Sequence, residues 1–538
     1  MAETETRNTP AERLKFLLTT GVTASTPAAR VGPVISAPNS MRADRAVSPW
    51  VARAAWTIIG AGILLRLVHL IADRNLWNDE LMLAEEVLPR ALGQLAQPFR
   101  ATGAPIGFLV VTRLMIDMLG TQDWVLRMVP FAAGCAALVL MYRIALRLLP
   151  PPAMLIAVAI LAFSEPAIYY ATEFKQYASD TATACAVLLS ALRVQERPES
   201  YGRAVVFAIV AVAAIWFSHP GVFVVAAAGL TLFATAVRAG RWRSAAALAA
   251  IGALCVANFV ATYVLSLRAL VSNDFLREVW ENSFMPLSPL AAARWLAATL
   301  YDLAGESGGV TIAGVAVLAA VLGTVAFVRE RPSVLGLLLL PIAFGMGASA
   351  LHAFPFAGRH TLFAAPALCL LIAAGIQGLA REPRPLPRLA GVLVAALVLL
   401  PPSLRSAQSA VHPEGREEIE TVLRHVAANW RRGDTLYLYY AAVRGFERYR
   451  NSAALPADVT PIISVRSRED WMRYETDMQQ LEGRTRVWVV FSHVYGAGEG
   501  SEERAIIGAL DWRGRRVDEV HAPGASAYLY DVSDNVAG

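Results

Sequence analysis

The chain has 538 residues, of which 56% are hydrophobic and 17% charged, with a formal net charge of +5. Soluble domains carry about 25% charged residues; the shortfall, together with a mean hydropathy of +0.46, excludes an ordinary soluble protein. The modest positive charge lies in short clusters between apolar runs, so we expect no nucleic-acid partner. The sequence therefore predicts a polytopic α-helical membrane protein.

The first fifty residues are polar, and a long apolar run follows them. That run is too long and too deep in the chain for a cleaved signal peptide, so we expect 1–50 to be a disordered cytoplasmic tail. A membrane-spanning helix needs about 20 apolar residues, and runs near that length recur along the chain. We expect about eleven spans, at 51–72, 125–147, 153–171, 179–194, 204–218, 220–237, 244–267, 310–328, 334–351, 361–379 and 389–405.

A shorter apolar run at 105–119 decides the topology. If it does not cross the bilayer, the arginines of the tail and those of the later basic loops fall on one side, as the positive-inside rule requires. If it does cross, the N-terminus and those loops lie on opposite faces. We therefore expect 105–119 to lie along the interface of a bacterial inner membrane, with the N-terminus in the cytoplasm and the C-terminus outside.

This topology predicts a transmembrane module over 51–405. Its outer loops are 73–124, 172–178, 268–309 and 352–360. The remainder, 412–538, predicts a small periplasmic α/β domain, because a helical pattern at 415–431 precedes β-rich runs at 435–442 and 486–492. The spans are almost free of ionisable residues, whereas acids and bases gather near the outer loops. That distribution indicates a site at the membrane surface.

The first outer loop carries adjacent carboxylates, Asp79 and Glu80, directly after Trp77. A carboxylate at this depth is suited to act as a general base, and partial desolvation is expected to raise its pKa. The alternative is structural: Asn78 or Asp79 would cap a helix that begins near Leu81.

The second outer loop places Glu173, Lys175 and Tyr177 within five residues. Lys175 could bind a phosphate as a point charge, and Glu173 could position a hydroxyl group or a metal-bound water. The alternative is a local Glu–Lys pair beside an aromatic belt.

Further cationic and imidazole groups lie at span ends on the same face. Arg359 and His360 open a span and suggest an anion site, although a histidine at a helix end is commonly structural. His219 lies at a tight corner, where a structural role is the default. Snorkelling to lipid head groups is the default explanation for Arg127 and Arg113.

Taken in order, these motifs resemble the GT-C membrane glycosyltransferases, specifically the protein mannosyltransferase and aminoarabinose transferase-like group (glycosyltransferase families 39 and 83). The resemblance lies in Asp79-Glu80, an Arg-Leu-Pro-like element at 127–130, an Ile-Tyr-Tyr element at 168–177, and an Arg-led element at 359–366. His360 stands where the group commonly has Tyr, and Lys175-Gln176 replaces its usual Arg-Pro.

The resemblance implies a polyprenyl-phosphate-linked sugar as donor and a hydroxyl group on a glycolipid, glycan or protein of the envelope as acceptor. Transfer would invert the anomeric centre in one displacement, with Asp79 as the base and Glu80 in support. The substrate-binding residues would be Glu173, Lys175, Tyr177, Arg127, His219, Arg359 and His360. It leaves a divalent metal open as a cofactor and predicts no other.

Two alternatives share the membrane location. An O-antigen-type lipid-carrier polymerase or ligase would use a large outer loop rich in Arg and His, which is hard to find here. A transporter for lipid-linked sugars would carry charged residues within its spans and an inverted repeat. The motifs favour the glycosyltransferase.

Overall fold

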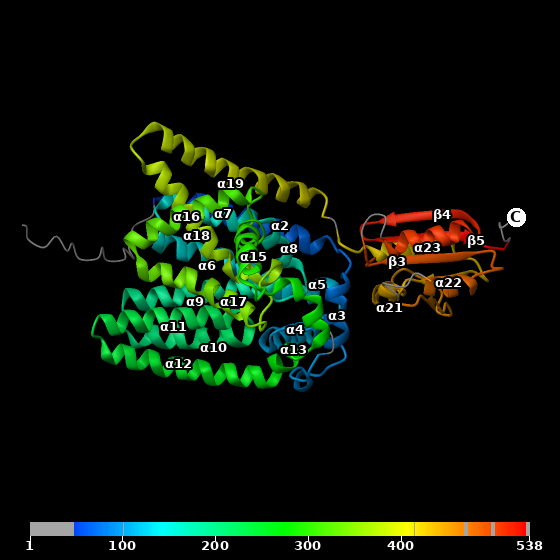
Figure 1. Ribbon diagram of the computed structural model, residues 1–538, viewed down its shortest axis with the longest axis horizontal. Helices are drawn as coiled ribbons and strands as arrows, with labels where there is room; N and C mark the ends of the chain where they lie inside the picture. The colour runs from blue at the N-terminus through cyan, green and yellow to red at the C-terminus, as the bar shows by residue number, and fades with distance from the viewer. Residues whose placement is uncertain (1–47, 100–101, 414, 467–471, 497–500, 534–538) are drawn as a thin grey trace, which may run out of the picture. The chain divides into compact units, whose positions relative to one another are not determined.

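The computed structural model describes residues 48–99, 102–413, 415–466, 472–496 and 501–533. The predicted tail at 1–50 lies outside these ranges except for its last three residues. Each of the eleven predicted runs coincides with one helix or with a bent pair of helices (Figure 1). These are α2 (Pro49–Ile71), α6 (Met128–Leu148), α7 (Pro151–Phe163) with α8 (Glu165–Tyr169), α9 (Tyr177–Glu196), α10 (Tyr201–Phe217), α11 (Gly221–Arg238), α12 (Trp242–Thr262), α16 (Ala313–Glu330), α17 (Pro332–Ala350), α18 (Ala365–Arg381) and α19 (Pro385–Val411).

Eight helices of the described chain are long and apolar enough to cross a membrane, and the bent pair of α7 and α8 makes nine. This confirms the predicted polytopic helical class. The other two predicted spans fall short of that test. α10 has only 17 residues, and α9 carries Asp180 with several Ser and Thr residues. The short run at 105–119 forms α4 (Ile106–Leu119), whose 14 residues are too few to cross a bilayer; its place along the interface stays a prediction.

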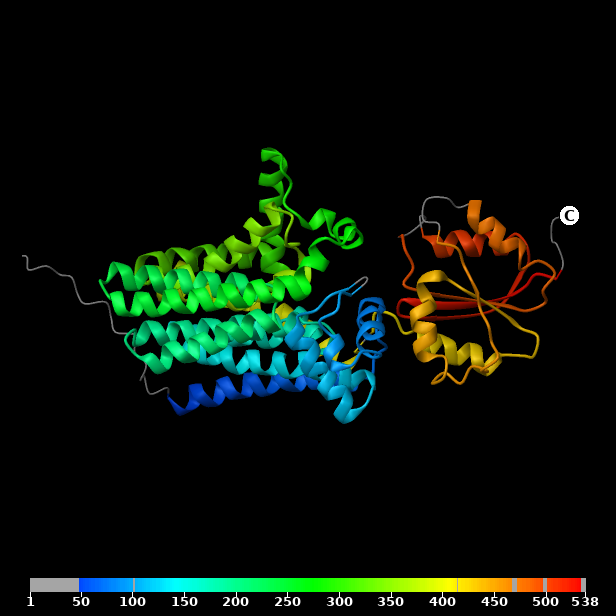
Figure 2. The same cartoon turned by 90° about the horizontal axis from the view of Figure 1, so that it is seen from below.

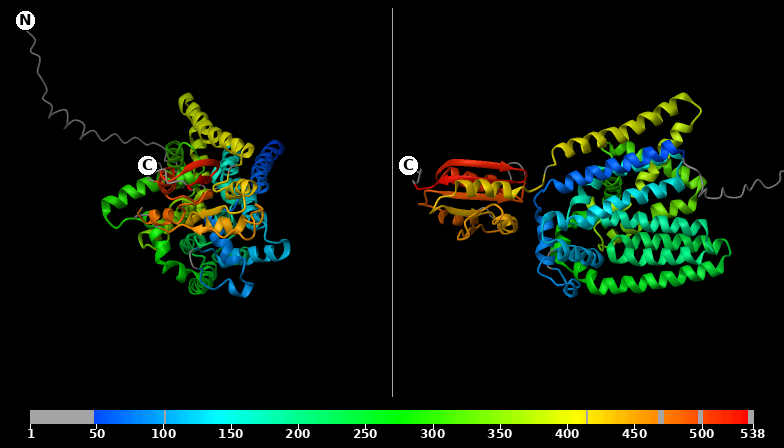
Figure 3. Two further views of the ribbon diagram at one scale, coloured as in Figure 1. Left: turned by 90° about the vertical axis from the view of Figure 1, so that its right-hand side faces the viewer. Right: turned by 180° about the vertical axis from the view of Figure 1, so that it is seen from behind.

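Two glycines allow a close crossing between helices α16 and α18. A Cβ atom on Gly323 would lie 1.9 Å from the carbonyl oxygen of Leu371, and one on Gly375 would lie 1.9 Å from that of Ala319. Small residues at such crossings let the backbones of membrane helices approach one another. α19 packs outside this pair and also contacts α2, as Figure 3 shows for the yellow and dark blue helices.

The break between α7 and α8 is held by Arg66, a buried arginine of α2. Its Nη1 atom donates to the carbonyl oxygens of Gly62 at 2.9 Å and Ala162 at 3.2 Å, and its Nη2 atom donates to that of Leu161 at 3.1 Å. Helix ends leave carbonyl groups without partners, and Arg66 satisfies them here. Arg66 and Asp180 are thus ionisable groups buried within predicted spans, where we expected almost none.

Short helices connect the spans. At the end of the bundle where α2 finishes, they hold the loops that carry the predicted site residues. The loop expected at 268–309 is therefore largely helical. These elements are α3 (Asn78–Val87), η1 (Leu92–Gln94), α5 (Asp123–Leu126), η2 (Tyr170–Thr172), η3 (Tyr263–Leu267), α13 (Arg268–Val271), α14 (Asp274–Val279), η4 (Glu281–Ser283), α15 (Pro289–Asp302), η5 (Leu303–Ser307) and η6 (Gly358–Ala364).

The C-terminal region forms the predicted α/β domain. Its sheet has the order β2-β1-β3-β5-β4; β1 is parallel to β2 and β3, and β5 is antiparallel to both β3 and β4. Figure 2 shows helices on both faces of this sheet. The elements are α20 (Ile419–Asn429), β1 (Thr435–Leu438), η7 (Tyr440–Ala442), α21 (Val443–Tyr449), β2 (Ile462–Ile463), α22 (Met472–Gln479), β3 (Val487–Ser492), α23 (Glu502–Asp511), β4 (Arg515–Ala522) and β5 (Ala525–Asp531).

Candidate active site

Two buried side chains, Glu80 of α3 and Arg127 at the start of α6, form an ion pair at the base of the site. The Arg127 Nε atom donates to Oε1 of Glu80 at 2.8 Å, and its Nη2 atom donates to Oε2 at 2.7 Å. Glu80 also accepts from the backbone N–H groups of Phe174 at 2.6 Å and Trp77 at 3.3 Å. Arg127 donates further to two backbone carbonyl oxygens of the loop before α3, at 2.7 and 3.1 Å.

These contacts engage every polar atom of both side chains. The supporting role of Glu80 in catalysis and the phosphate-binding role of Arg127 stay predictions, and the geometry favours a structural role for both. The capping alternative is wrong as stated, because α3 begins at Asn78, three residues before Leu81, and Glu80 accepts the N–H of the preceding Trp77. Asp79, in the first turn, is left to face the site.

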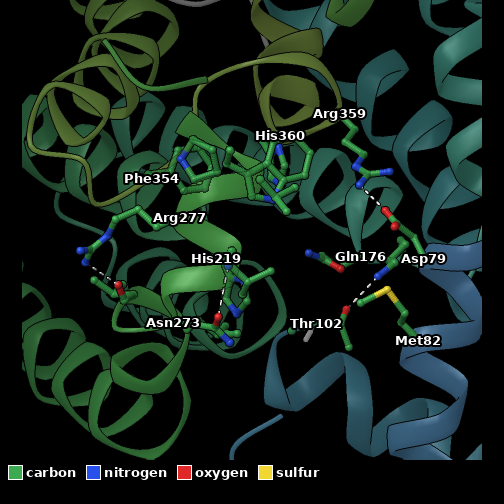
Figure 4. A pocket seen from close by; sticks show the side chains of 18 of the residues that line it. Asp79, Met82, Thr102, Gln176, His219, Asn273, Arg277, Phe354, Arg359 and His360 are labelled. Carbon is green, nitrogen blue, oxygen red and sulfur yellow. Dashed lines mark hydrogen bonds and ion pairs between the residues drawn. The ribbon is translucent and has the colours of Figure 1, made fainter. Parts of the chain in front are cut away.

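Asp79 pairs with Arg359, which η6 brings from 280 residues further along the chain (Figure 4). The Arg359 guanidinium lies 5.2 Å from the ring centroid of Trp77, 5.4 Å from that of Tyr177 and 5.3 Å from that of Trp280. Aromatic faces attract a guanidinium at such distances. The sequence placed Asp79 and Arg359 on one face of the membrane, and the structure brings them into contact.

The charges around Asp79 correct one expectation. Burial alone would raise its pKa, but the positive charges of Lys175 and Arg359 outweigh burial, and the pKa of Asp79 is lowered. Partial desolvation therefore does not by itself make Asp79 a stronger base here. The carboxylate is held ionised beside its cationic partners.

The second loop places its two charged side chains differently. Lys175 is buried, donates from Nζ to Oγ1 of Thr102 at 3.0 Å, and has its pKa lowered by burial. Glu173 is also buried, and its two carboxylate oxygens have no hydrogen-bond partner among the described residues. Burial, with the charge of Glu80, raises the pKa of Glu173 to about 7. The predicted local Glu–Lys pair does not form, because no ion pair joins the two side chains in the described chain.

Two cavities meet at Arg359. The first, which we call the Asp79 cavity, has a volume of about 540 Å³, and Figure 4 shows side chains that line it. Its polar lining includes Asn78, Asp79, Thr102, Lys175, Arg359 and His493. The second, the arginine cavity, has a volume of about 610 Å³ and is lined by Glu165, Tyr169, Tyr170, Arg359, Arg405 and Arg416, among others. Glu173 lines neither cavity.

The predicted imidazole groups lie in the wall of the Asp79 cavity. The ring of His360 packs edge-on against Trp280, with centroids 4.4 Å apart, and against Tyr177 at 5.7 Å. Burial lowers the pKa of His219 to about 4, so this side chain is neutral near pH 7. His360 is therefore part of an aromatic wall of the Asp79 cavity. His219 lines the same cavity as a neutral side chain.

The comparisons with known proteins agree with this architecture. Residues 103–265 match the family described as dolichyl-phosphate-mannose-protein mannosyltransferase. The apo oligosaccharyltransferase of Archaeoglobus fulgidus is 12% identical with a TM-score of 0.51, over 89% of this chain and 74% of that one. ArnT from Cupriavidus metallidurans, bound to undecaprenyl phosphate, is 13% identical with a TM-score of 0.50, over 92% and 99%. No curated protein sequence matches the chain.

The chain has the GT-C fold. The predicted resemblance to the protein mannosyltransferase and aminoarabinose transferase-like group is confirmed, by sequence over 103–265 and by fold over most of the chain. A divalent metal cofactor stays an untested prediction. Among the described residues, no group of three or more His, Cys, Asp or Glu side chains is placed to hold one. Asp79 is engaged by Arg359, and Glu173 lies behind the cavity walls.

Arg416 and His493 are among the cavity residues that sequence reasoning missed. Arg416 lies just after α19, and its guanidinium is 4.4 Å from the ring centroid of Trp77 and 4.5 Å from that of Tyr169. An arginine beyond the last predicted span, on the side that the predicted topology places outside, was a usable signal. His493 directly follows β3, the central strand of the sheet, and the carboxyl ends of strands are where open α/β sheets commonly place ligand sites.

As the pH rises, the free energy of unfolding should fall less in Glu173→Gln than in the wild type. The folded protein keeps the Glu173 proton up to about pH 7, whereas an ordinary Glu loses it near 4.5. The stability from this group is therefore full below pH 4.5 and is lost as the pH rises through 7. At 1.36 kcal/mol per pKa unit, the variant should gain up to about 3 kcal/mol at pH 8 and little at pH 4.5.

Thermal unfolding of detergent-solubilised protein at the two pH values measures this effect. Glu330→Gln, at the exposed end of α16, is the matched control and should leave the pH dependence unchanged. If Glu173→Gln behaves like this control, Glu173 is ionised in the folded protein at neutral pH, and the assignment of its proton is wrong.

Proposed function

We propose that the chain transfers a sugar from a polyprenyl-phosphate donor to an acceptor hydroxyl group at the outer face of a bacterial inner membrane. The observation that carries this proposal is the position of Arg359, which lines both cavities and pairs with Asp79 between them. One cavity would hold the donor phosphate and the other the acceptor. The family match supports a glycosyltransferase, and the ArnT structure of the same fold holds undecaprenyl phosphate.

The arginine cavity suits the donor phosphate. Arg359, Arg405 and Arg416 line it, and arginine binds phosphate oxygens through paired N–H donors. The Nε atom of Arg359 is buried without a partner among the described residues, so this guanidinium has unused donor capacity. Leu362 and Pro402 add apolar surface to the same wall. Since Pro402 belongs to α19, a candidate span, the prenyl chain can approach from the membrane side.

The Asp79–Arg359 pair links donor binding to the base. A phosphate that draws Arg359 away from Asp79 removes one of the charges that lower the pKa of Asp79. Burial then acts with less opposition and raises that pKa, which makes the carboxylate a better base. Asp79 takes the acceptor hydroxyl proton, the acceptor oxygen bonds to the anomeric carbon, and the bond from that carbon to the phosphate oxygen breaks. The phosphate leaves with its charge held by the arginines.

Orientation is part of the proposal. The N-terminus would be cytoplasmic and the C-terminal domain periplasmic, as the basic loops predict. A cysteine introduced into 238–243 should react with a membrane-impermeant thiol reagent only after the inner membrane is opened, and one introduced at His412 should react in intact spheroplasts. The reverse pattern would place Asp79 in the wrong compartment and end the proposal.

Arg416→Ala should weaken undecaprenyl phosphate binding by about tenfold or more. Hydrogen bonds to charged groups contribute about 1.5–3 kcal/mol, and 1.4 kcal/mol corresponds to a factor of ten. Titration of the purified variant with undecaprenyl phosphate measures the change. Arg504→Ala is the control, because Arg504 is exposed on α23 and lines neither cavity. Equal affinities of the two variants for undecaprenyl phosphate would show that the phosphate binds outside the arginine cavity.

Asp79→Asn should lower transfer by about 10²-fold or more, the scale of a lost general base. The substitution keeps the size of the side chain and removes its charge, which also frees Arg359. Undecaprenyl phosphate should therefore bind at least as tightly as to the wild type. Transfer is measured from a panel of undecaprenyl-phosphate sugars to an envelope extract. A nearly normal rate would show that the Asp79 carboxylate is not the base.

A further inference from the structure

The segment that carries Asp79 is fastened to the C-terminal domain through its neighbour Asn78. The backbone N–H of Asn78 donates to Oε2 of Glu417 at 2.8 Å. Its side-chain Oδ1 accepts from Nη1 of Arg444 at 3.4 Å, and its Nδ2 faces Nε2 of His493 at 3.2 Å. Two positions earlier, the backbone N–H of Leu76 donates to a tyrosine hydroxyl of the same domain at 2.6 Å. These contacts fix the turn from which α3 starts.

Glu417 also sets the tautomer of His493. The two side chains lie 2.6 Å apart, from Nδ1 of the imidazole to Oε1 of the carboxylate. A carboxylate only accepts, so Nδ1 carries a proton, and in the neutral imidazole Nε2 is then the acceptor. Arg444 holds Oδ1 of Asn78, which turns the Nδ2 donor of that amide toward Nε2. Each contact in the series Glu417–His493–Asn78 therefore joins one hydrogen-bond donor to one acceptor.

His493 is held in an unusual backbone conformation. Its φ is +54°, in the left-handed region that non-glycine residues seldom adopt. Such strain persists only where the surrounding structure enforces it, and it gathers at functional sites. His493 and Tyr495 also line the Asp79 cavity, and their rings pack edge to face with centroids 5.0 Å apart.

We propose that His493 is a positioning residue for Asp79, through which the C-terminal domain takes part in transfer. This rests on the proposed function of the Asp79 cavity and assigns the C-terminal domain a role in it. A carboxylate that must meet a hydroxyl proton while staying near Arg359 has little freedom, and misplacement by about 1 Å can cost about 10²-fold in rate. The held amide of Asn78 restricts the first turn of α3 and, with it, Asp79.

The test compares two substitutions of His493 in the full-length protein. His493→Ala removes the acceptor for Asn78 and should lower kcat by about tenfold to a hundredfold, with an unchanged donor KM. His493→Gln places an amide oxygen near the position of Nε2 and should recover most of kcat. Ala and Gln are both non-glycine residues and meet the same cost at this left-handed position, so backbone strain does not by itself explain a rescue. If His493→Gln is as slow as His493→Ala, the imidazole acts otherwise than by positioning.

The same domain offers a matched control. His425 pairs with Asp518 at 2.8 Å, a similar histidine–carboxylate contact that lines neither cavity. His425→Ala should leave kcat unchanged. In a double-mutant cycle, adding His493→Ala to Asp79→Asn should cost no further rate, because the base being positioned is already absent. A fully additive loss would overturn the proposal.

Hydrogen exchange gives a readout that does not depend on activity. In His493→Ala, the amides of 75–79 should exchange faster than in the wild type, while those of β3 stay protected. Unchanged exchange at 75–79 would overturn the positioning role even if kcat fell. If the wild type transfers no sugar from any donor tested, the proposed function fails, and the exchange measurement still decides whether His493 holds the Asp79 segment.

Discussion

The buried ion pair between Glu80 and Arg127 is the constraint on which the site depends. Breaking such a pair by removing one partner leaves an uncompensated charge in the protein, which costs about 3–5 kcal/mol. Through this pair, the start of α6 is tied to α3 and to the backbone N–H of Phe174. Asp79 adjoins Glu80, and Lys175 adjoins Phe174, so one contact places the carboxylate and the ammonium group relative to each other.

Helix geometry makes the adjacent acids Asp79 and Glu80 face different surroundings. Successive residues on a helix point about 100° apart, so Glu80 can face the buried arginine while Asp79 faces the cavity. Glu80 has 2% of its side chain exposed and Asp79 has 23%. The family resemblance assigned the base to Asp79 and a supporting role to Glu80, but residue type could not divide these roles, since both residues carry the same functional group. What separates them in the structure is the position of Arg127.

The fold was predictable from the sequence because it depends on local composition. Apolar runs of bilayer length predict the helices, and the change of pattern after 412 predicts the α/β domain. The site was predictable only in part. Asp79 and Arg359 carried signals at span ends, but the sequence gives no measure of their contact across 280 residues. His493 lies 415 residues from Asn78 in the sequence. Their contact forms only in the folded structure, so the sequence could not predict it. The lowered pKa of Asp79 likewise depends on partners that the sequence does not place.

The charge balance of the site favours a fixed order of binding in the proposed reaction. Without donor, Lys175 and Arg359 together hold Asp79 ionised with a lowered pKa, and the carboxylate is a poor base. An acceptor that arrives first therefore meets an inactive group. The donor phosphate competes for Arg359, and only then does burial make Asp79 a stronger base. Glu173, whose pKa burial raises to about 7, carries less negative charge at neutral pH than an ordinary glutamate and so opposes the incoming phosphate less. In the proposed reaction, the same arginine thus binds one substrate and prepares the site for the other.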